Sequence, residues 1–328
     1  MNSSNLLRNY QIINVRNSDK TFVFGLGIHA GFYSEINMMV LAIVYSLHFK
    51  IQFKLHSGNA NFKLDKGWND YFLPFCTEEN NSLLDRYNQR YRINYKTDFT
   101  KPRRMYRKLD YEIMLKYTKV KSGANFLTFD LWDEILNRKL EKLHYSIPEL
   151  GIEGDLRHAC NQVLRFIWQF NPKTESTINQ IVDNLSLPEK YIGFQIRRGD
   201  KIEESNPISI ENYISEAASR STIRNAFVLT DDYRVIEDLQ TNYPGWNFYT
   251  LCKETEKGYT HNEFYSQEKS LIYTGIVGLL ANIEILRRSE LFIGTFSTNP
   301  SMFLGMIMGK DKAISVDVPW QVWYGKEA

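Results

Sequence analysis

Cysteine is scarce in this sequence. Cys76, Cys160 and Cys252 lie far apart, and no Cys-x-x-Cys pair occurs. Three scattered thiols provide neither the paired ligands of a structural zinc site nor the even number of partners that a disulfide framework needs. This cysteine usage is typical of proteins from a reducing compartment.

Long apolar runs are also missing. The longest, Met38 to Leu47, is about half the length that a helix needs to cross a bilayer. Residues 1–20 are polar and lack the apolar centre of a signal peptide. We therefore expect no membrane span in this chain. The expected location is cytoplasmic for the chain as given, or the lumen of the Golgi or endoplasmic reticulum if an N-terminal anchor was removed.

An excess of charge is the third feature that the sequence lacks. A net charge of +2 argues against nucleic-acid binding through a broad basic field. Residues 86–117 are locally rich in arginine and tyrosine, a combination that can bind single strands. Interspersed aspartate and glutamate dilute that charge, so we expect a solvated surface, and no nucleic-acid partner. Part of an acceptor groove is the other alternative for this segment.

The 328 residues are enough for two domains of ordinary size. We place the boundary at Asn171-Pro172, which ends a helical pattern, and so expect domains 1–172 and 173–328. In the first half, a strand from Thr21 to Leu26 is followed by a glycine-rich turn, a helix and a second strand. Residues 77–121 are expected to form a loop. The expected elements of the first half are the strands 21–26 and 51–55 and the helices 32–49, 126–145 and 155–169.

The second half alternates strands and helices regularly. This alternation predicts an α/β fold with a parallel, doubly wound sheet. The expected strands are 192–196, 226–230, 246–251, 291–293 and 313–316, and the expected helices are 176–187, 209–220, 233–242, 268–288 and 301–308.

Polar side chains follow three of these strands at the point where each strand ends. Parallel strands have their carboxyl ends at one edge of the sheet, so clusters about a hundred residues apart in sequence can meet there. The clusters are Arg197, Arg198, Asp200 and Lys201; Asp231 and Asp232; and Thr295, Ser297, Thr298 and Asn299.

The chemistry of the three clusters is complementary. Guanidinium groups bind phosphate oxygens in a bidentate manner and neutralise the charge on a departing diphosphate. A glycine turn that opens a helix offers N–H and hydroxyl donors to a phosphate, and a carboxylate can orient a ribose or take a proton. The combination predicts an enzyme acting on a nucleotide sugar. Each cluster also has a structural alternative: a helix N-cap, a tight turn or an internal ion pair.

Three blocks of the sequence resemble the α-1,6-fucosyltransferase family and its α-1,2- and protein O-fucosyltransferase relatives. The first, Gln195-Ile-Arg-Arg-Gly-Asp-Lys, is similar to the signature His-x-Arg-Arg-x-Asp-Lys. The other two are Val228-Leu-Thr-Asp-Asp followed by Asn242-Tyr-Pro, and Glu290-Leu-Phe-Ile-Gly-Thr-Phe-Ser-Thr, in the family's order. The glycine turn and Gly67-Trp68 also match, so the likeness extends over roughly residues 21 to 310.

The resemblance implies a GT-B fold, with two Rossmann-like lobes facing a cleft, the N-terminal lobe on the acceptor side and the C-terminal lobe binding the nucleotide sugar. It implies an inverting fucosyltransferase that uses GDP-β-L-fucose, a glycan or oligosaccharide acceptor and no metal or other cofactor. Arg197 would contact the β-phosphate beside Asp200 and Lys201. The other residues carried over to the donor site are Gly31, Arg198, Asp231, Asp232, Thr295, Ser297, Thr298 and Asn299.

The sequence departs from the family at the donor and base positions. Gln195 replaces the signature histidine near the nucleotide, and Asn282 replaces an aspartate that reads guanine, where an amide is the weaker acceptor. The acidic base corresponds to Glu203 or Glu204, because the segment after Lys201 is short. The alternatives are an inactive nucleotide- or glycan-binding protein of the same fold and a glycosyltransferase with another nucleotide sugar.

Overall fold

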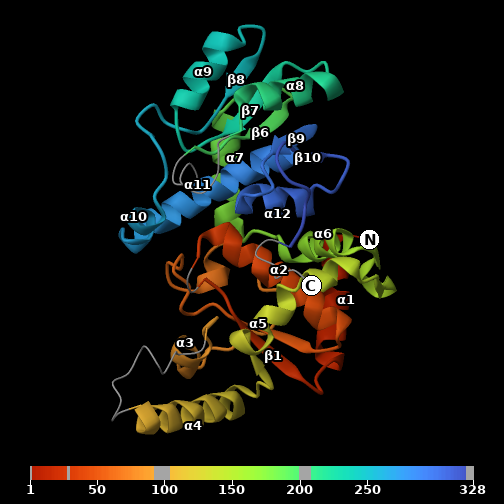
Figure 1. Cartoon of the computed structure of the whole chain (residues 1–328), viewed down its shortest axis with the longest axis vertical. Coiled ribbons are helices and arrows are strands. Elements are labelled where there is room, and N and C mark those ends of the chain that lie inside the picture. The colour runs from red at the N-terminus through yellow and green to blue at the C-terminus, as the bar shows by residue number, and fades with distance from the viewer. Residues whose placement is uncertain (1, 28–29, 92–103, 199–207, 323–328) are drawn as a thin grey trace. The chain divides into compact units, whose positions relative to one another are not determined.

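A computed structural model describes residues 2–27, 30–91, 104–198 and 208–322 of the chain (Figure 1). The chain divides into two compact units. The first comprises Met1–Ala30, Met38–Gln169 and Val322–Ala328, and the second comprises Gly31–Asn37 and Phe170–Gln321. The main boundary lies three residues before the one expected from the sequence, and the short segment 31–37 belongs to the second unit.

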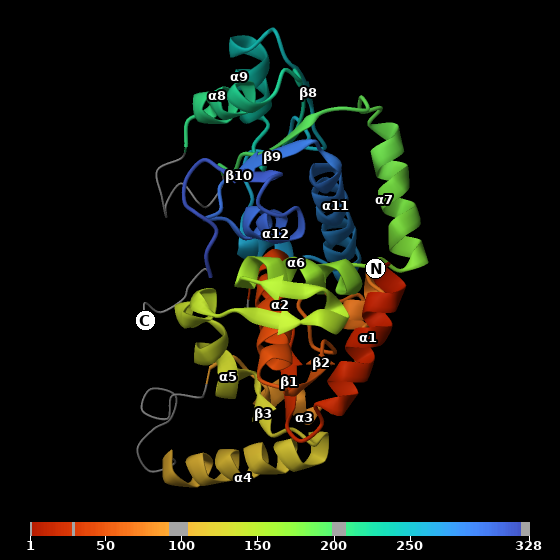
Figure 2. The same ribbon diagram turned by 90° about the vertical axis from the view of Figure 1, so that its right-hand side faces the viewer.

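The first unit contains a three-stranded parallel sheet in the order β2-β1-β3. A two-stranded antiparallel hairpin, β4-β5, follows later in the same unit (Figure 2). The elements are α1 (Ser3–Arg16), β1 (Thr21–Gly25), α2 (Phe32–His48, which begins in the second unit), β2 (Gln52–His56), α3 (Leu83–Tyr87), α4 (Arg104–Ser122), β3 (Phe126–Leu127), α5 (Thr128–Ile135), β4 (Tyr145–Ile147), β5 (Ile152–Gly154) and α6 (Leu156–Ile167).

Helices contact this small sheet on one face and at its β2 edge. Val23 of β1 packs with Leu84 of α3 and with Tyr111 and Leu115 of α4. Helix α1 is bound to β2 through Asn14, whose Nδ2 donates to the Phe53 carbonyl at 2.8 Å while its Oδ1 accepts from the Phe53 N–H at 2.7 Å. The Asn14 amide therefore replaces a missing strand neighbour at this edge of β2.

Gly27, in the turn after β1, has a structural reason to be glycine. Its φ is +76°, and a Cβ there would lie 2.5 Å from Cε1 of Phe62. The Gly27 carbonyl also accepts from the N–H of Asn61 at 2.6 Å. Left-handed backbone and close packing together explain this glycine without a ligand.

Two expectations for the first unit were wrong, and one helix was not expected. The helix expected over 126–145 is broken, because Phe126–Leu127 pairs with β1 and the chain then forms α5, a short 3₁₀ helix and β4. The loop expected over 77–121 contains α3 and α4. Helix α1 was missed, although its buried residues Leu6, Tyr10 and Ile13 have helical spacing.

The second unit is built on a five-stranded, fully parallel sheet in the order β10-β9-β6-β7-β8, which confirms the expected alternating α/β pattern. Helix α7 begins at Pro172, four residues earlier than expected, and α10 was not expected. The elements are α7 (Pro172–Asn184), β6 (Ile192–Gln195), α8 (Ile210–Arg220), β7 (Asn225–Leu229), α9 (Arg234–Asn242), β8 (Asn247–Tyr249), α10 (His261–Tyr265), α11 (Lys269–Arg288), β9 (Leu291–Gly294), α12 (Asn299–Ile307) and β10 (Ala313–Ser315).

The central strand β6 shows how helices cover both faces of this sheet. Ile192 and Phe194 pack in one apolar cluster with residues of α8 and α9. Gly193 points to the opposite face, where a Cβ would lie 2.8 Å from Cδ2 of Leu286 in α11. Alternate residues of β6 therefore face different helix layers, and Gly193 lets α11 approach closely.

Helix α11 is the one helix in the described ranges that is long and apolar enough to cross a membrane. Half of its apolar stretch is buried inside the unit. The helix packs against α7, α12, β6 and β7. These contacts are those of a core helix.

Candidate active site

The candidate site lies where strands β6, β7 and β9 of the second unit end. Strand β6 pairs with β7 on one side and with β9 on the other, so its carboxyl end lies between theirs. Gln195 is opposite Leu229, and Phe194 is opposite Ile293. This register brings the residues after 195, 229 and 294 to one edge of the sheet, as the sequence predicted.

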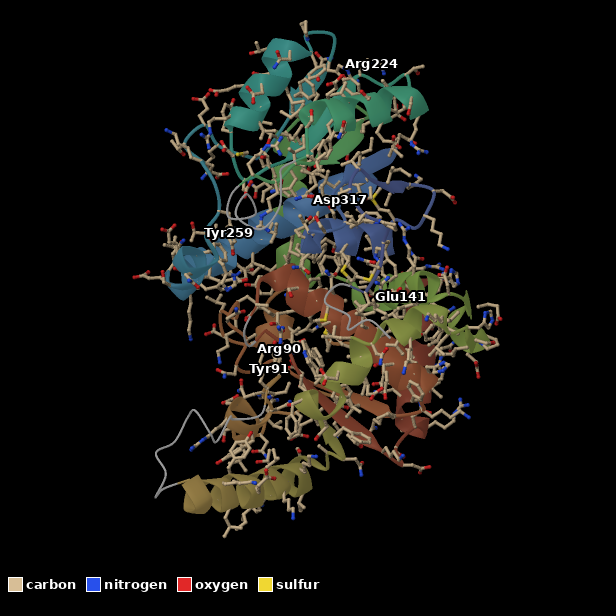
Figure 3. All side chains as sticks on the ribbon, in the orientation of Figure 1. Arg90, Tyr91, Glu141, Arg224, Tyr259 and Asp317 are labelled. Atoms are coloured by element: carbon tan, nitrogen blue, oxygen red, sulfur yellow. The ribbon has the colours of Figure 1, made fainter. Side chains whose placement is uncertain are left out.

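Arg197 is held at this edge by a carboxylate and an aromatic ring. Its Nε lies 3.7 Å from Oδ2 of Asp231, with side-chain exposures of 21% and 16%. Its Cζ lies 5.6 Å from the ring centre of Tyr259, within cation–π range. Tyr259, labelled in Figure 3, is brought there by backbone pairing, since the Gly258 N–H donates to the Asp231 carbonyl at 2.7 Å. The guanidinium is thus positioned at a partly exposed point at the end of β6.

Arg198 is hydrogen-bonded to other residues of the second unit. Its N–H donates to Oδ1 of Asp231 at 2.8 Å, and its Nη2 donates to the carbonyl of Ile208 at 3.0 Å. Asp231 therefore connects both arginines, through the side chain of Arg197 and the backbone of Arg198. The two arginines that the sequence places side by side have different roles in the structure.

Asp232 is used inside the fold. It is buried, and both of its oxygens accept hydrogen bonds from Arg234, at 3.0 Å for the Nε–Oδ2 pair. Its Oδ1 also accepts from the Arg234 N–H at 3.1 Å. The hydrogen bonds from the Arg234 side chain are the main reason that the pKa of Asp232 is lowered. Asp232 is therefore paired with the largely exposed Arg234 at the start of α9, which is a structural role.

Replacing Arg234 by alanine is expected to make the acid dependence of stability weaker. A carboxyl whose pKa is lower in the folded state stabilises the fold above its unfolded pKa, and this contribution is lost as the pH falls through the folded pKa. The variant should therefore melt at a lower temperature than the wild type at neutral pH. The difference should be smaller at about pH 3, below the usual aspartate pKa, where this contribution is already being lost. Thermal unfolding at both pH values measures this effect.

Arg224→Ala is the matched control, because Arg224 donates to the carbonyls of Ser221 and Ile223 and not to a carboxylate. Its effect on the melting temperature should be similar at both pH values. A pH-independent loss in Arg234→Ala would show that the ion pair does not act as described.

Gln195 is the centre of a buried hydroxyl cluster beneath the Gly294–Thr298 turn. Its side-chain carbonyl oxygen accepts from Ser301 Oγ at 2.6 Å and lies 3.1 Å from Thr298 Oγ1 and 3.4 Å from Thr295 Oγ1. Gln195 is 3% exposed, and Ser301 is fully buried. An amide oxygen has two lone pairs, whereas a neutral imidazole offers one acceptor nitrogen, so glutamine suits a site where hydroxyls converge.

The N–H groups of the same turn are bound by a carboxylate from the neighbouring strand. Asp317 follows β10, and its Oδ1 accepts from the Phe296 N–H at 2.8 Å while Oδ2 accepts from the Ser297 N–H at 3.2 Å (Figure 3). Thr295 and Thr298 are buried, and Ser297 is half-buried. Of the three turn hydroxyls predicted to hold phosphate, Ser297 is therefore the one nearest to solvent.

Gly31 and Asn299 both lie in the second unit, at the N-terminal ends of α2 and α12. The carbonyl of Gly31 accepts from the Glu35 N–H at 3.1 Å at the beginning of α2. Asn37 of α2 donates through Nδ2 to the carbonyl of Asn299 at 3.0 Å. Asn282 lies in α11, where its Nδ2 donates to the carbonyl of Gly278 at 2.9 Å. The remaining predicted residues, Asp200, Lys201, Glu203 and Glu204, lie outside the described residues.

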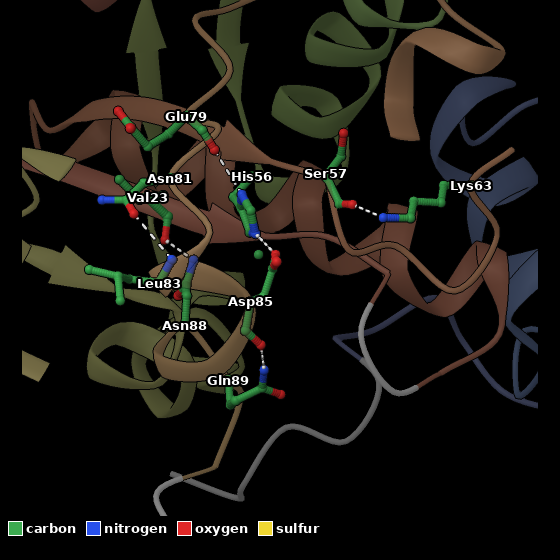
Figure 4. A network of polar contacts seen from close by, with 12 residues as sticks. Val23, His56, Ser57, Lys63, Glu79, Asn81, Leu83, Asp85, Asn88 and Gln89 are labelled. Atoms are coloured by element: carbon green, nitrogen blue, oxygen red, sulfur yellow. Dashed lines mark hydrogen bonds and ion pairs between the residues drawn. The ribbon is translucent and has the colours of Figure 1, made fainter. Parts of the chain in front are cut away.

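A second polar cluster lies in the first unit at the carboxyl end of β2 (Figure 4). The buried His56 ring has Nδ1 2.7 Å from the carbonyl of Glu79 and Nε2 2.9 Å from Oδ1 of Asp85. Ser57 donates to Glu78, and burial is the main cause that raises the pKa of Glu78. These contacts hold the segment after β2 against the sheet, which is a structural role.

The arginine- and tyrosine-rich segment does not present all its cations to solvent. Arg90 is 8% exposed, and its Cζ lies 4.7 Å from the ring centre of Trp132. Arg86 lies over the ring of Tyr87 at 5.5 Å. Residues 92–103 of the segment lie outside the described residues. An arginine packed on a buried tryptophan serves the core and is a poor contact for nucleic acid.

Sequence reasoning missed Tyr259, Ser301 and Asp317. The signal for Asp317 was present, because it directly follows the last predicted strand, as the other site residues follow theirs. Tyr259 lies in an irregular segment between β8 and α10, where no sequence pattern places it near Arg197. Among the described residues, no three His, Cys, Asp or Glu side chains gather as metal ligands would.

The fold and the site define a two-unit α/β protein whose second unit carries arginine, aspartate and hydroxyl side chains at one edge of its sheet. The sequence profile of the family described as "Alpha-(1,6)-fucosyltransferase N- and catalytic domains" matches residues 133–301, just over half of the chain. The chain belongs to this family. The matched region includes Arg197, Asp231 and the Gly294–Thr298 turn.

Two relatives illustrate the extent of the likeness. An alpha-(1,6)-fucosyltransferase of Drosophila melanogaster is 24% identical over 147 residues, which are 42% of this chain and 23% of that protein. The chain thus matches about a quarter of the length of this curated relative. The crystal structure of NodZ alpha-1,6-fucosyltransferase soaked with GDP-fucose has a TM-score of 0.51, 12% identity, and coverage of 88% of this chain and 93% of that chain. This likeness confirms the expected α/β fold of the GT-B class.

Proposed function

We propose that this protein is an inverting fucosyltransferase that transfers L-fucose from GDP-β-L-fucose to a hydroxyl of a glycan. One observation carries the proposal: Arg197, in the family's signature position, is oriented by Asp231 and Tyr259 at a partly exposed sheet edge. A cation fixed in this manner suits a diphosphate leaving group. Membership of the α-1,6-fucosyltransferase family and the NodZ-like fold support the same donor.

In the proposed reaction, Arg197 neutralises the charge that develops on GDP as the bond to the anomeric carbon of fucose breaks. Ser297, the most accessible hydroxyl of the Gly294–Thr298 turn, donates to a phosphate oxygen. The acceptor oxygen attacks from the opposite face, and its proton passes to a carboxylate, for which Glu204 and Glu203 are the candidates. Inversion follows from this single displacement.

Chelation is expected to leave turnover unchanged. The proposal assigns charge compensation to Arg197, so the initial rate with GDP-fucose in EDTA should be the same, within about twofold, as the rate with added manganese. Initial rates after exhaustive dialysis against EDTA measure this. Complete loss of turnover on chelation, with recovery on adding manganese, would contradict the metal-independent mechanism.

The donor assignment is tested by GDP release from GDP-fucose, with and without glycan acceptors. GDP-mannose and UDP-galactose are the matched donors, one sharing the nucleotide and the other sharing neither nucleotide nor sugar. We expect GDP-fucose to be turned over fastest and acceptors to accelerate it. Faster release from another donor would assign a different nucleotide sugar. Tight GDP binding without turnover would favour an inactive binding protein, the alternative raised by the changes at Gln195 and Asn282.

A further inference from the structure

The turn between β9 and α12 is held from both sides by single side chains. From the interior, Gln195 holds the hydroxyls of Ser301, Thr298 and Thr295. From the edge of the sheet, Asp317 binds the N–H groups of Phe296 and Ser297. The contacts of Gln195 fix hydroxyls that are buried. The orientation of Ser297 therefore depends on the contacts of Asp317.

Asp317 is itself tightly fixed. Its Oδ1 also accepts from Ser315 Oγ at 2.6 Å and from the Val318 N–H at 2.6 Å. Ser315 is the last residue of β10 and is paired with Gly294 at the start of the turn, and the Val316 N–H donates to the Gly294 carbonyl at 3.0 Å. The edge strand thus places the carboxylate directly against the turn that follows β9.

This arrangement changes what the turn can offer to a ligand. The Phe296 and Ser297 N–H groups, which would otherwise be donors to a phosphate at a helix start, already bind a carboxylate. The hydroxyl of Ser297, which is half-buried beside these N–H groups, is the donor that we assign to a ligand. The backbone of the turn fixes its position. An error of about 1 Å in the position of such a donor can weaken its contact severely.

We propose that Asp317 is a positioning residue that, through the Ser297 backbone N–H, sets the Ser297 hydroxyl for the diphosphate of the donor. The proposal rests on the proposed function, since it assigns a donor diphosphate to this edge. It predicts that Asp317 affects donor binding and not the chemical step, because Asp317 acts through Ser297.

Asp317→Asn is a selective test. If the asparagine keeps its carbonyl oxygen in the Oδ1 position, where three donors converge, its NH₂ replaces Oδ2 and faces the Ser297 N–H, donor against donor. We expect KM for GDP-fucose and Kd for GDP to rise about tenfold, as for one lost charge-assisted hydrogen bond, with kcat changed less than about threefold. Asp311→Asn, an exposed change just before β10, is the control and should leave both constants unchanged.

A double-mutant cycle with Ser297→Ala separates positioning from general stabilisation. If Asp317 acts through Ser297, the two substitutions together should raise KM no more than the larger single effect. The inference would be overturned if the two substitutions raised KM multiplicatively, or if Asp317→Asn had the KM of the wild type. In either case, turnover by the wild-type protein would leave the proposed function intact. A wild-type protein that binds neither GDP nor GDP-fucose would overturn the proposed function first. If Asp317→Asn does not fold, Ser315→Ala replaces it in the cycle with the same criteria. This change removes the 2.6 Å hydrogen bond to Asp317 Oδ1 and the hydroxyl that accepts from the Asp317 N–H at 3.2 Å and the Phe296 N–H at 3.4 Å.

Discussion

Arg197→Ala should lower kcat/KM for GDP-fucose by about a hundredfold to a thousandfold, the usual loss when one charge-stabilising donor is removed from an active site. The side chain is partly exposed, and its contacts include Asp231 and Tyr259 at the edge of the sheet. The fold should therefore survive, with a melting temperature within a few degrees of the wild type. Steady-state kinetics and thermal unfolding of the same preparations measure both quantities.

Arg220→Ala is the control for this experiment. Arg220 pairs with Glu216 one turn earlier on α8 and is largely exposed, so its removal should leave kinetics and stability nearly unchanged. A near wild-type kcat in Arg197→Ala would remove Arg197 from the leaving-group role, whatever the effect on KM. Loss of activity with loss of the fold would assign it a structural role instead.

Gln195→Leu should lower the free energy of unfolding by about 1–3 kcal/mol, because it leaves a buried hydroxyl without its acceptor. Ser301 is the residue most affected, since its Oγ is 2.6 Å from the amide oxygen and fully buried. The Thr298 hydroxyl keeps a second acceptor, the Thr295 carbonyl at 2.9 Å. Loosening of the turn should also raise KM for the donor. Denaturant unfolding and donor kinetics measure the two effects.

Gln180→Leu, an exposed change on α7 of the same unit, controls for the loss of a glutamine as such. Its unfolding free energy should stay within about 0.5 kcal/mol of the wild type. Unchanged stability in Gln195→Leu would show that the hydroxyl cluster contributes little. A large loss of stability with an unchanged KM would separate the cluster from donor binding.

The second unit could be predicted from the sequence almost element by element. Each of its strands is a short apolar run that ends in charged or turn residues, so local pattern and tertiary position agree. In the first unit, Phe126–Leu127 looked helical but pairs with β1, because an open sheet edge outweighs the local preference. The β4–β5 hairpin was not predicted. Its turn begins at Pro148 and ends at Gly151, whose φ is +65°.

The site could be predicted only as far as the edge of the sheet. Strand ends placed Arg197, Asp231 and Ser297 together, because parallel strands share their direction. Which polar residues remain available to a ligand depends on partners that the sequence does not reveal. Asp232 is bound by Arg234, two residues away, and Gln195 by Ser301, over a hundred residues away. Both contacts depend on how the side chains are oriented in the folded unit.

We propose that the sheet edge around Arg197 serves fucose transfer from GDP-fucose. An array of glycans and oligosaccharides, incubated with the wild-type protein and GDP-fucose labelled in the sugar, tests this role. We expect labelled fucose on at least one class of acceptor, formed in EDTA and absent with Arg197→Ala. GDP-fucose binding without label on any acceptor, or equal labelling by Arg197→Ala, would rule this role out.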